Sequence, residues 1–159
     1  MSYTTICVAA ALQRYLDITP IAARIRDLAG TIAAAHEIPV AIVSVEASVE
    51  LLPDVETMEE KIERYAAPLQ EQGLTVSTAV RSGRPSREII AHVGEVGADL
   101  LIIGSHSKRG PLDVGLGSTA SALLRDLETT VIMVRPTEAE RQMAADLMIP
   151  RYPWVFPYG

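Results

Sequence analysis

The residues from Asp99 to Pro136 hold the pattern in this chain that is best suited to bind a ligand. An apolar run, Leu100–Ile103, ends at Gly104 and is followed by a loop rich in glycine, serine and basic residues. The loop leads into Gly117-Ser118-Thr119, which opens an amphipathic segment. A buried strand, a loop and a helix N-terminus in this order direct backbone N–H groups toward one point, where an anion can bind. The phosphate tail of a nucleotide is an anion that suits this arrangement.

Each residue type in the loop has a chemical use. The two glycines that bound it lack a Cβ, so the backbone can approach a ligand closely. Ser118 and Thr119 offer hydroxyl and N–H groups to phosphate oxygens, and Lys108 and Arg109 can neutralise a polyphosphate from the outer side. The alternative is a long crossover whose glycines serve turns and whose serines cap a helix. The thirteen residues between strand and helix exceed the usual length of such a connection, which favours a functional loop.

The spacing of these residues resembles the nucleotide loop of the universal stress protein family. The family's usual form is Gly-x-x-Gly, nine residues, then Gly-Ser or Gly-Thr. This chain reads Gly104-x-x-Ser107, nine residues, then Gly117-Ser118. One glycine is therefore replaced by Ser107, which can still present its N–H unless the turn requires a positive φ. The resemblance covers roughly residues 3–136 and includes the segments 82–85, 97–100 and 131–136.

The resemblance implies that the loop surrounds the ribose and phosphates of ATP or AMP, with or without Mg²⁺ carried by the nucleotide. The expected contacts on this side are Ile103, Gly104, Ser107, Lys108, Arg109, Gly117, Ser118 and Thr119.

On the adenine side, family members usually carry an aspartate just after the first strand. Counting from the strand places Ala11 at that position, whereas counting back from the first helix places Asp17 there, in Asp17-Ile18-Thr19-Pro20. Asp17 is then either a contact to the base, displaced by about six extra residues, or an exposed acid that assists the helix N-terminus. The resemblance suggests a further contact to adenine from the backbone near Val45.

Strand and helix patterns alternate along the chain. This order predicts an α/β fold in which right-handed crossovers build one doubly wound parallel sheet with helices on both faces. The resemblance implies five strands in the order 3-2-1-4-5, an adenine nucleotide alpha hydrolase-like fold. The reversal of winding between strands one and four is where ligands bind in such sheets. The expected strands are 4–11, 39–46, 74–80, 100–104 and 130–134, and the expected helices are 20–36, 56–72 (which Pro68 should kink or interrupt), 85–96, 118–127 and 137–148.

The composition limits the possible partners. Hydrophobic residues make up 48% of the 159 residues and aromatic residues only 4%, so the core is aliphatic. The net charge of −6 argues against nucleic acid as the main partner. The single cysteine, Cys7, lies in an apolar strand, which predicts a buried side chain and a reducing compartment. Without an apolar run of about eighteen residues, we expect a cytoplasmic protein that does not span a membrane.

The C-terminal segment differs in character from the rest. We expect a nucleotide-binding domain over residues 1–136, followed by a helix and a tail rich in proline and aromatic residues over 137–159. Four of the chain's seven aromatic residues fall within 150–159, either packed on their own domain or, as we favour, in contact with a second subunit or a protein partner. The strand 130–134 resembles the family's pairing edge and suggests a homodimer.

Two functions follow from these patterns. The first is a regulatory protein that binds an adenine nucleotide in the crevice beside the Gly104–Ser118 loop. The second is a family member that has lost nucleotide binding and docks partners through its tail, which Ala11 and Ser107 favour. No nucleophile–base pair or metal cluster is apparent, so we expect no enzyme activity beyond weak ATP hydrolysis, and no metal site.

Overall fold

One parallel sheet organises the computed structural model, which describes residues 2–12, 17–46, 56–105 and 117–147. Its strand order is β3-β2-β1-β4-β5, and every neighbouring pair is parallel. The α/β class and the 3-2-1-4-5 order are thereby confirmed. The strands are β1 (Ile6–Ala9), β2 (Val40–Glu46), β3 (Val76–Ser82), β4 (Leu100–Gly104) and β5 (Thr130–Val134).

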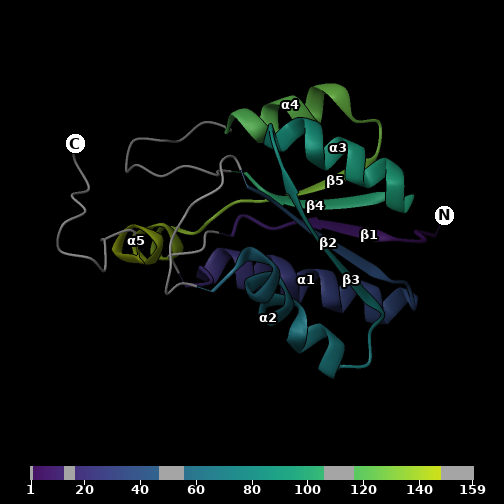
Figure 1. Ribbon diagram of the computed structural model, residues 1–159, viewed down its shortest axis with the longest axis horizontal. Coiled ribbons are helices and arrows are strands. Elements are labelled where there is room, and N and C mark those ends of the chain that lie inside the picture. The colour runs from purple at the N-terminus through teal and green to yellow at the C-terminus, as the bar shows by residue number, and fades with distance from the viewer. Residues whose placement is uncertain (1, 13–16, 47–55, 106–116, 148–159) are drawn as a thin grey trace.

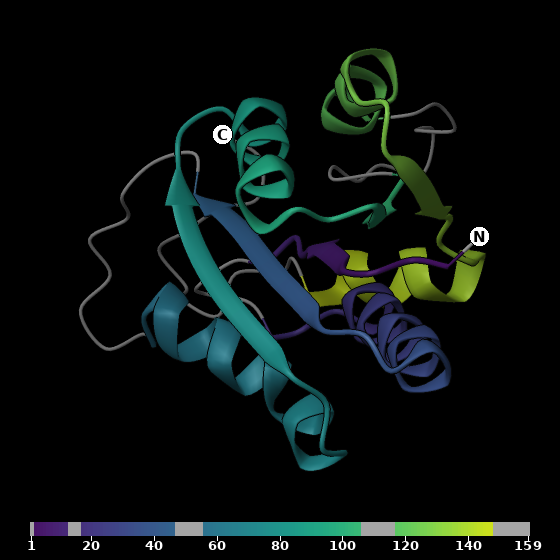
Figure 2. The ribbon, with the colours of Figure 1, turned by 90° about the vertical axis from the view of Figure 1, so that its right-hand side faces the viewer.

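Helices cover both faces of the sheet (Figures 1 and 2). Helices α1 and α2 pack on one face, and α3 and α4 pack on the other. Helix α5 lies beyond the carboxyl ends of the strands, beside the start of α1. The helices are α1 (Pro20–His36), α2 (Met58–Glu71), α3 (Pro85–Val96), α4 (Ser118–Asp126) and α5 (Glu138–Leu147).

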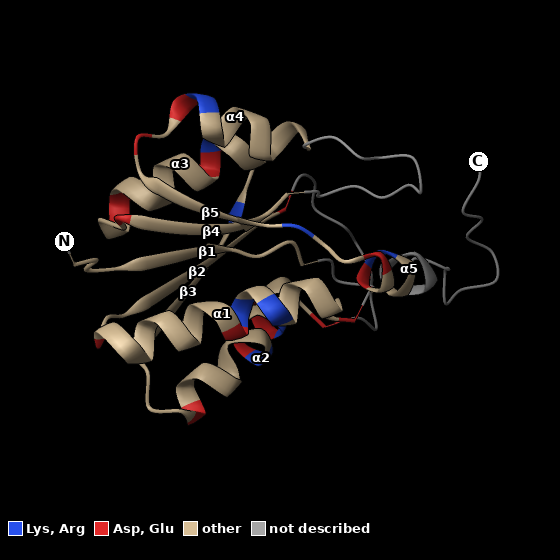
Figure 3. Ribbon diagram, turned by 180° about the vertical axis from the view of Figure 1, so that it is seen from behind, with Lys and Arg blue, Asp and Glu red and all other residues tan. Residues whose placement is uncertain are grey.

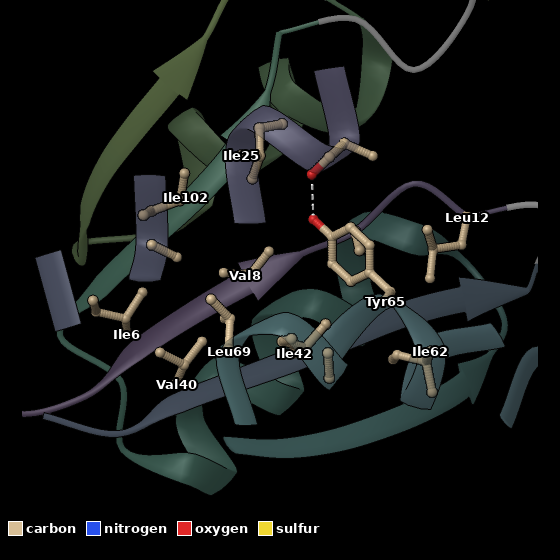
Figure 4. Close-up of a cluster of buried hydrophobic side chains, with 14 of the residues drawn as sticks. Ile6, Val8, Leu12, Ile25, Val40, Ile42, Ile62, Tyr65, Leu69 and Ile102 are labelled. Atoms are coloured by element: carbon tan, nitrogen blue, oxygen red, sulfur yellow. Dashed lines mark hydrogen bonds between the residues drawn. The ribbon is translucent and has the colours of Figure 1, made fainter. Parts of the chain in front are cut away.

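The alternation of side chains along β1 divides the core between the two faces. Ile6 and Val8 point into the cluster under α1 and α2, which Figure 4 shows, whereas Cys7 points into the cluster under α3 and α4. All three are completely buried, and β1 is the central strand of the sheet. Burial raises the pKa of the Cys7 thiol to about 12, so this thiol stays protonated, in agreement with a structural role.

Tyr65 fixes α2 against α1. Its side chain is completely buried, and its hydroxyl donates a 2.5 Å hydrogen bond to the Ala22 carbonyl, drawn as a dashed line in Figure 4. The guanidinium of Arg26 lies 5.4 Å from the centre of the tyrosine ring. The first turns of α1 and the middle of α2 are therefore held together, which positions the charged residues described below.

Several boundaries differ from expectation by one or two residues; β3, for example, spans Val76–Ser82 where 74–80 was expected. Strand β1 is shorter than the predicted 4–11, because Ala10 onward leaves the sheet's regular pairing. Helix α2 runs unbroken through Pro68, so of the expected kink or interruption the interruption is wrong, and the kink stays a prediction. Pro68 lies in the last turn, where its missing N–H removes one helical bond, and the next residue, Leu69, is fully buried.

Candidate functional site

The central strand β1 and its neighbour β4 part at the carboxyl edge of the sheet. They are paired as far as Val8 and Ile102. Beyond that point Ala10 donates its N–H to the Val43 carbonyl of β2 (2.8 Å), whereas Ser105 donates to the Val134 carbonyl of β5 (2.9 Å). The segment after β1 therefore stays beside β2, and the segment after β4 stays beside β5. We call the opening between Ala10 and Ser105 the fork. It lies where the winding direction of the sheet reverses, which is where ligands bind in such sheets.

The amino terminus of α4 lies at one side of this fork. The Gly117 N–H donates to the Ser105 carbonyl (2.9 Å), which anchors the start of the helix beside the end of β4. The first helical bond runs from the Ser121 N–H to the Gly117 carbonyl, and the N-cap glycine has no side chain to bond the first turn. The N–H groups of residues 118–120 therefore have no acceptor inside the helix. With no acidic residue in the first turn, the helix dipole favours an anion there.

Ser105 is a site residue that the sequence did not single out. It is completely buried, and its N–H and carbonyl join β5 to the start of α4. Gly104 pairs with Val134, and Ile103, only 3% exposed, points into the core under α3 and α4. Of the residues expected at the phosphates, Ser118 is exposed and Thr119 is half-buried.

The chain that follows β1 forms the other side of the fork. Its carbonyl at Ala10 accepts a 2.9 Å hydrogen bond from the buried Ser44 hydroxyl, so this segment stays beside β2. Leu12 turns into the core, and Ala11 between them is exposed. The position that counting from the strand predicts for a carboxylate is thus occupied by a methyl group at the surface.

The backbone of Val45 faces the fork. Peptide groups alternate in direction along a strand. The Val43 carbonyl accepts from Ala10 on the β1 side, and the Glu46 carbonyl accepts from Gly83 on the β3 side. The N–H and carbonyl of Val45 therefore point to the β1 side, beyond the last pairing of β1 with β2 at Ala9 and Val43.

Asp17 lies within a cluster of charges that joins the start of α1 to α2, and Figure 3 shows charges of both signs between these helices. Arg64 donates to both oxygens of Glu56, at 2.5 and 3.3 Å. This bond raises the pKa of Arg64, and the nearby carboxylate of Asp17 raises it further. The same bond lowers the pKa of Glu56, and the fully buried Lys61 adds to that effect. Asp17 is exposed, and its carboxylate lies near both Arg64, whose pKa it raises, and Glu56, whose pKa it also raises.

The structure brings most of the predicted residues to the fork. Ile103, Gly104, Gly117, Ser118 and Thr119 gather on the α4 side, and Ala11 and Val45 lie on the other side. Asp17 is placed two residues before the N-cap of α1. Ser107, Lys108 and Arg109 lie outside the described residues.

The described part of the chain contains no group of three or more histidine, cysteine, aspartate or glutamate residues placed to hold a metal ion. None of its helices combines the length and the apolar character needed to cross a membrane.

Comparison with known proteins identifies related sequences. The model of the universal stress protein family matches residues 9–135. Two curated relatives from Methanocaldococcus jannaschii are the universal stress proteins MJ0531, 27% identical over 97 residues, and MJ0577, 28% identical over 80 residues. These matches cover 60% and 50% of this chain. They span 57% and 49% of the relatives, or about half of their length.

Solved structures share the fold over most of the chain. The structure of MJ0577 superposes with a TM-score of 0.69 at 20% identity, covering 86% of this chain and 99% of the other. An Archaeoglobus fulgidus universal stress protein in complex with dAMP has a TM-score of 0.61 at 20% identity and covers 84% and 98% of the two chains. An Arabidopsis thaliana family protein with AMP bound has a TM-score of 0.62 at 18% identity and covers 86% and 94%.

Proposed function

Because the chain belongs to the universal stress protein family, we propose that it binds an adenine nucleotide, ATP or AMP, between β1 and β4. In this proposal the protein is regulatory, and binding alters its contacts with other proteins. The observation that carries it is the start of α4, where N–H groups without a helical acceptor lie at the fork of the sheet. The relatives with bound AMP and dAMP support an adenine nucleotide as the ligand.

The phosphates bind on the α4 side. The N–H groups of Ser118 and Thr119 donate to phosphate oxygens, and their hydroxyls add donors. Gly117 keeps the approach open because it has no Cβ, and Gly104 does the same beside the ribose. Lys108 and Arg109 neutralise the tail from the loop, Ser107 contributes its N–H, and any Mg²⁺ arrives with the nucleotide.

The base binds on the other side of the fork. The N–H and carbonyl of Val45 suit the donor and acceptor edge of adenine. Asp17, held near Arg64, accepts a hydrogen bond from the base or from the ribose. Ala11 leaves space for the ring at the surface. The site contains no proposed nucleophile, so hydrolysis of ATP is weak.

In this proposal, nucleotide binding acts on other proteins through two contact regions. Strand β5 is an edge of the sheet, and we infer that residues 130–134 pair with a second copy of the chain. The aromatic segment 150–159 contacts a protein partner.

One observation favours the alternative, a protein that docks partners without a nucleotide. The exposed methyl group of Ala11 occupies the position where family members usually have a carboxylate, and Asp17 is already engaged with α2. Nucleotide binding by the purified chain separates the two functions.

The test is a thermal-shift and calorimetric titration of the full chain with ATP, ADP, AMP and adenosine. A ligand at one hundred times its Kd should stabilise the fold by about 2.7 kcal/mol. Gly117→Val should abolish the effect of ATP, because its side chain fills the space of a phosphate. The matched control is Gly94→Val on α3, where an added Cβ has nothing within 4 Å. A melting temperature that does not move at millimolar nucleotide would reject the proposal.

A further inference from the structure

Arg24 of α1 ties together three parts of the chain that are far apart in sequence. Its Nη2 donates to the Arg135 carbonyl just after β5 (2.7 Å) and to Glu140 Oε1 of α5 (2.7 Å). Its Nε donates to Glu140 Oε2 (2.9 Å). A guanidinium that binds both carboxylate oxygens and a carbonyl at once fixes geometry as well as charge. Arg24 thus joins α1 to the end of β5 and to α5, which lies beyond the residues that match the family model.

Other hydrogen bonds already hold the Glu140 carboxylate in position for its contact with Arg24. Its side chain is only 12% exposed, and its Oε1 also accepts the Thr137 N–H (2.9 Å), while the Thr137 hydroxyl accepts the Glu140 N–H (3.1 Å). These two bonds form the capping box of α5. The hydrogen bonds from Arg24 lower the pKa of the Glu140 carboxyl, with a further contribution from Thr137. The first turn of α5 is therefore held in one position beside the start of α1, at the carboxyl edge of the sheet (Figures 1 and 2).

Two hydrogen bonds and one step along the backbone lead from this contact to the start of α4. Arg135 follows Val134, whose carbonyl accepts the Ser105 N–H at 2.9 Å. The carbonyl of Ser105 accepts the Gly117 N–H, also at 2.9 Å. Val134 is buried and Ser105 is completely buried, so both links are shielded from water. The position of the first turn of α4 thus depends on the end of β5, which Arg24 holds.

We propose that Arg24 is a positioning residue for the phosphate side of the nucleotide site. Through the Arg135 carbonyl it fixes the end of β5, and through Ser105 it fixes the direction in which the first N–H groups of α4 point. It does not contact the nucleotide. This inference rests on the proposed function, and it deepens that function by making α5 a structural part of the site.

The experiment compares ligands with and without phosphate. The full chain and its variants Arg24→Gln, Glu140→Gln and Arg125→Gln are titrated with ATP, AMP and adenosine. Arg24→Gln should weaken ATP binding by about fivefold or more, the size of a typical coupling between sites, and leave adenosine binding unchanged. Glu140→Gln should have a smaller effect, since the bond to the Arg135 carbonyl remains. Arg125, an exposed arginine of α4 that pairs with the adjacent Asp126, is the matched control and should behave as wild type.

A second measurement needs no nucleotide. Backbone amide exchange at Ser105 and Gly117 should be faster in Arg24→Gln than in Arg125→Gln, and Glu140→Gln serves if Arg24→Gln does not fold. Equal exchange at these two amides, or an equal loss of ATP and adenosine affinity, overturns the inference while the proposed function stands. A wild-type chain that binds no adenine ligand overturns the proposed function, and the exchange rates then decide whether Arg24 positions α4.

Discussion

Helices α1 and α4 both begin at the fork between β1 and β4, but their amino termini are completed differently. In α1 the Thr19 hydroxyl accepts the Ala22 N–H (3.2 Å), and Pro20, at the first helical position, has no N–H. In α4 the N-cap is Gly117, which supplies no side chain. At the start of α1 a side chain accepts the Ala22 N–H and Pro20 needs no acceptor, whereas α4 has no side-chain cap for its first N–H groups.

The difference shows how one fork can hold a ligand with two chemically different ends. An anion gains less at α1, because Pro20 offers no N–H, because the Ala22 N–H is already bonded to Thr19, and because the nearby carboxylates of Asp17 and Glu56 repel it. The same anion gains donors and the helix dipole at α4. A nucleotide placed across the fork would therefore orient with its phosphates at α4 and its base toward β2.

The largest expected effect comes from making α4 resemble α1. In Gly117→Asp the new carboxylate should cap the first turn, because residue 117 has the extended backbone of an N-cap (φ −65°, ψ 159°). The unliganded protein should gain a few tenths of a kcal/mol in unfolding free energy. It should lose the stabilisation by ATP, about 2.7 kcal/mol at one hundred times the Kd, because the carboxylate occupies the N–H groups and repels phosphate.

The matched control for this variant is Thr19→Ala, which removes the cap of α1. It should lower the free energy of unfolding by about 1 kcal/mol and leave the Kd for ATP unchanged. Chemical denaturation with and without ATP measures both quantities. A Gly117→Asp protein that ATP still stabilises would show that the phosphates do not bind at α4.

The next largest effect concerns the base side. Asp17→Asn removes a charged acceptor that we place on the adenine or ribose, so affinity should fall about tenfold, as expected for one hydrogen bond to a charged group. ATP and adenosine should lose affinity equally, because both carry the base and the ribose. Calorimetric titration measures the ratio.

The control is Asp27→Asn, which neutralises an exposed aspartate of α1 that pairs with the adjacent Arg26. A loss for ATP alone would place Asp17 near the phosphates instead. No loss for either ligand would make Asp17 a structural partner of α2 only.

The sequence predicted the fold well because each element has a local signal. These signals depend only on residues that are close in the sequence. Examples are the apolar runs of β1 and β4, the Thr19-Pro20 start of α1 and the glycine at the start of α4. Contacts between residues that are distant in the sequence could not be predicted from it. The Thr-x-x-Glu spacing of Thr137 and Glu140 is that of a capping box, but nothing in the sequence indicates that Arg24, 116 residues away from Glu140, binds its carboxylate.

Buried charged and polar side chains were missed for a related reason. The composition of residues 56–63 is typical of an acidic, solvated helix face, but Lys61 is completely buried and Glu56 is paired with Arg64. His92 is also buried, whereas the apolar Ile90 of the same helix is only partly covered. Burial lowers the pKa of His92, and Arg81, which bonds Glu88 and Glu95 on the same helix, lowers it further. Helical spacing in the sequence indicates which residues share one face of a helix. It does not indicate which polar residues on that face the neighbouring elements bury.

The smallest expected effect tests whether the start of α1 needs α5. The pKa of Glu140 lies below its ordinary value of 4.5 when it is bonded to Arg24, so the undocked helix binds more protons in acid. Docking is therefore fully favoured above pH 4.5 and is lost as the pH falls through the lowered pKa. Amide exchange of residues 138–143 should rise over that interval, while the capped first turn of α1, closed by Thr19, should stay protected. Glu140→Gln should show no such pH dependence. If the wild type and this variant respond alike to acid, another carboxylate controls the docking of α5.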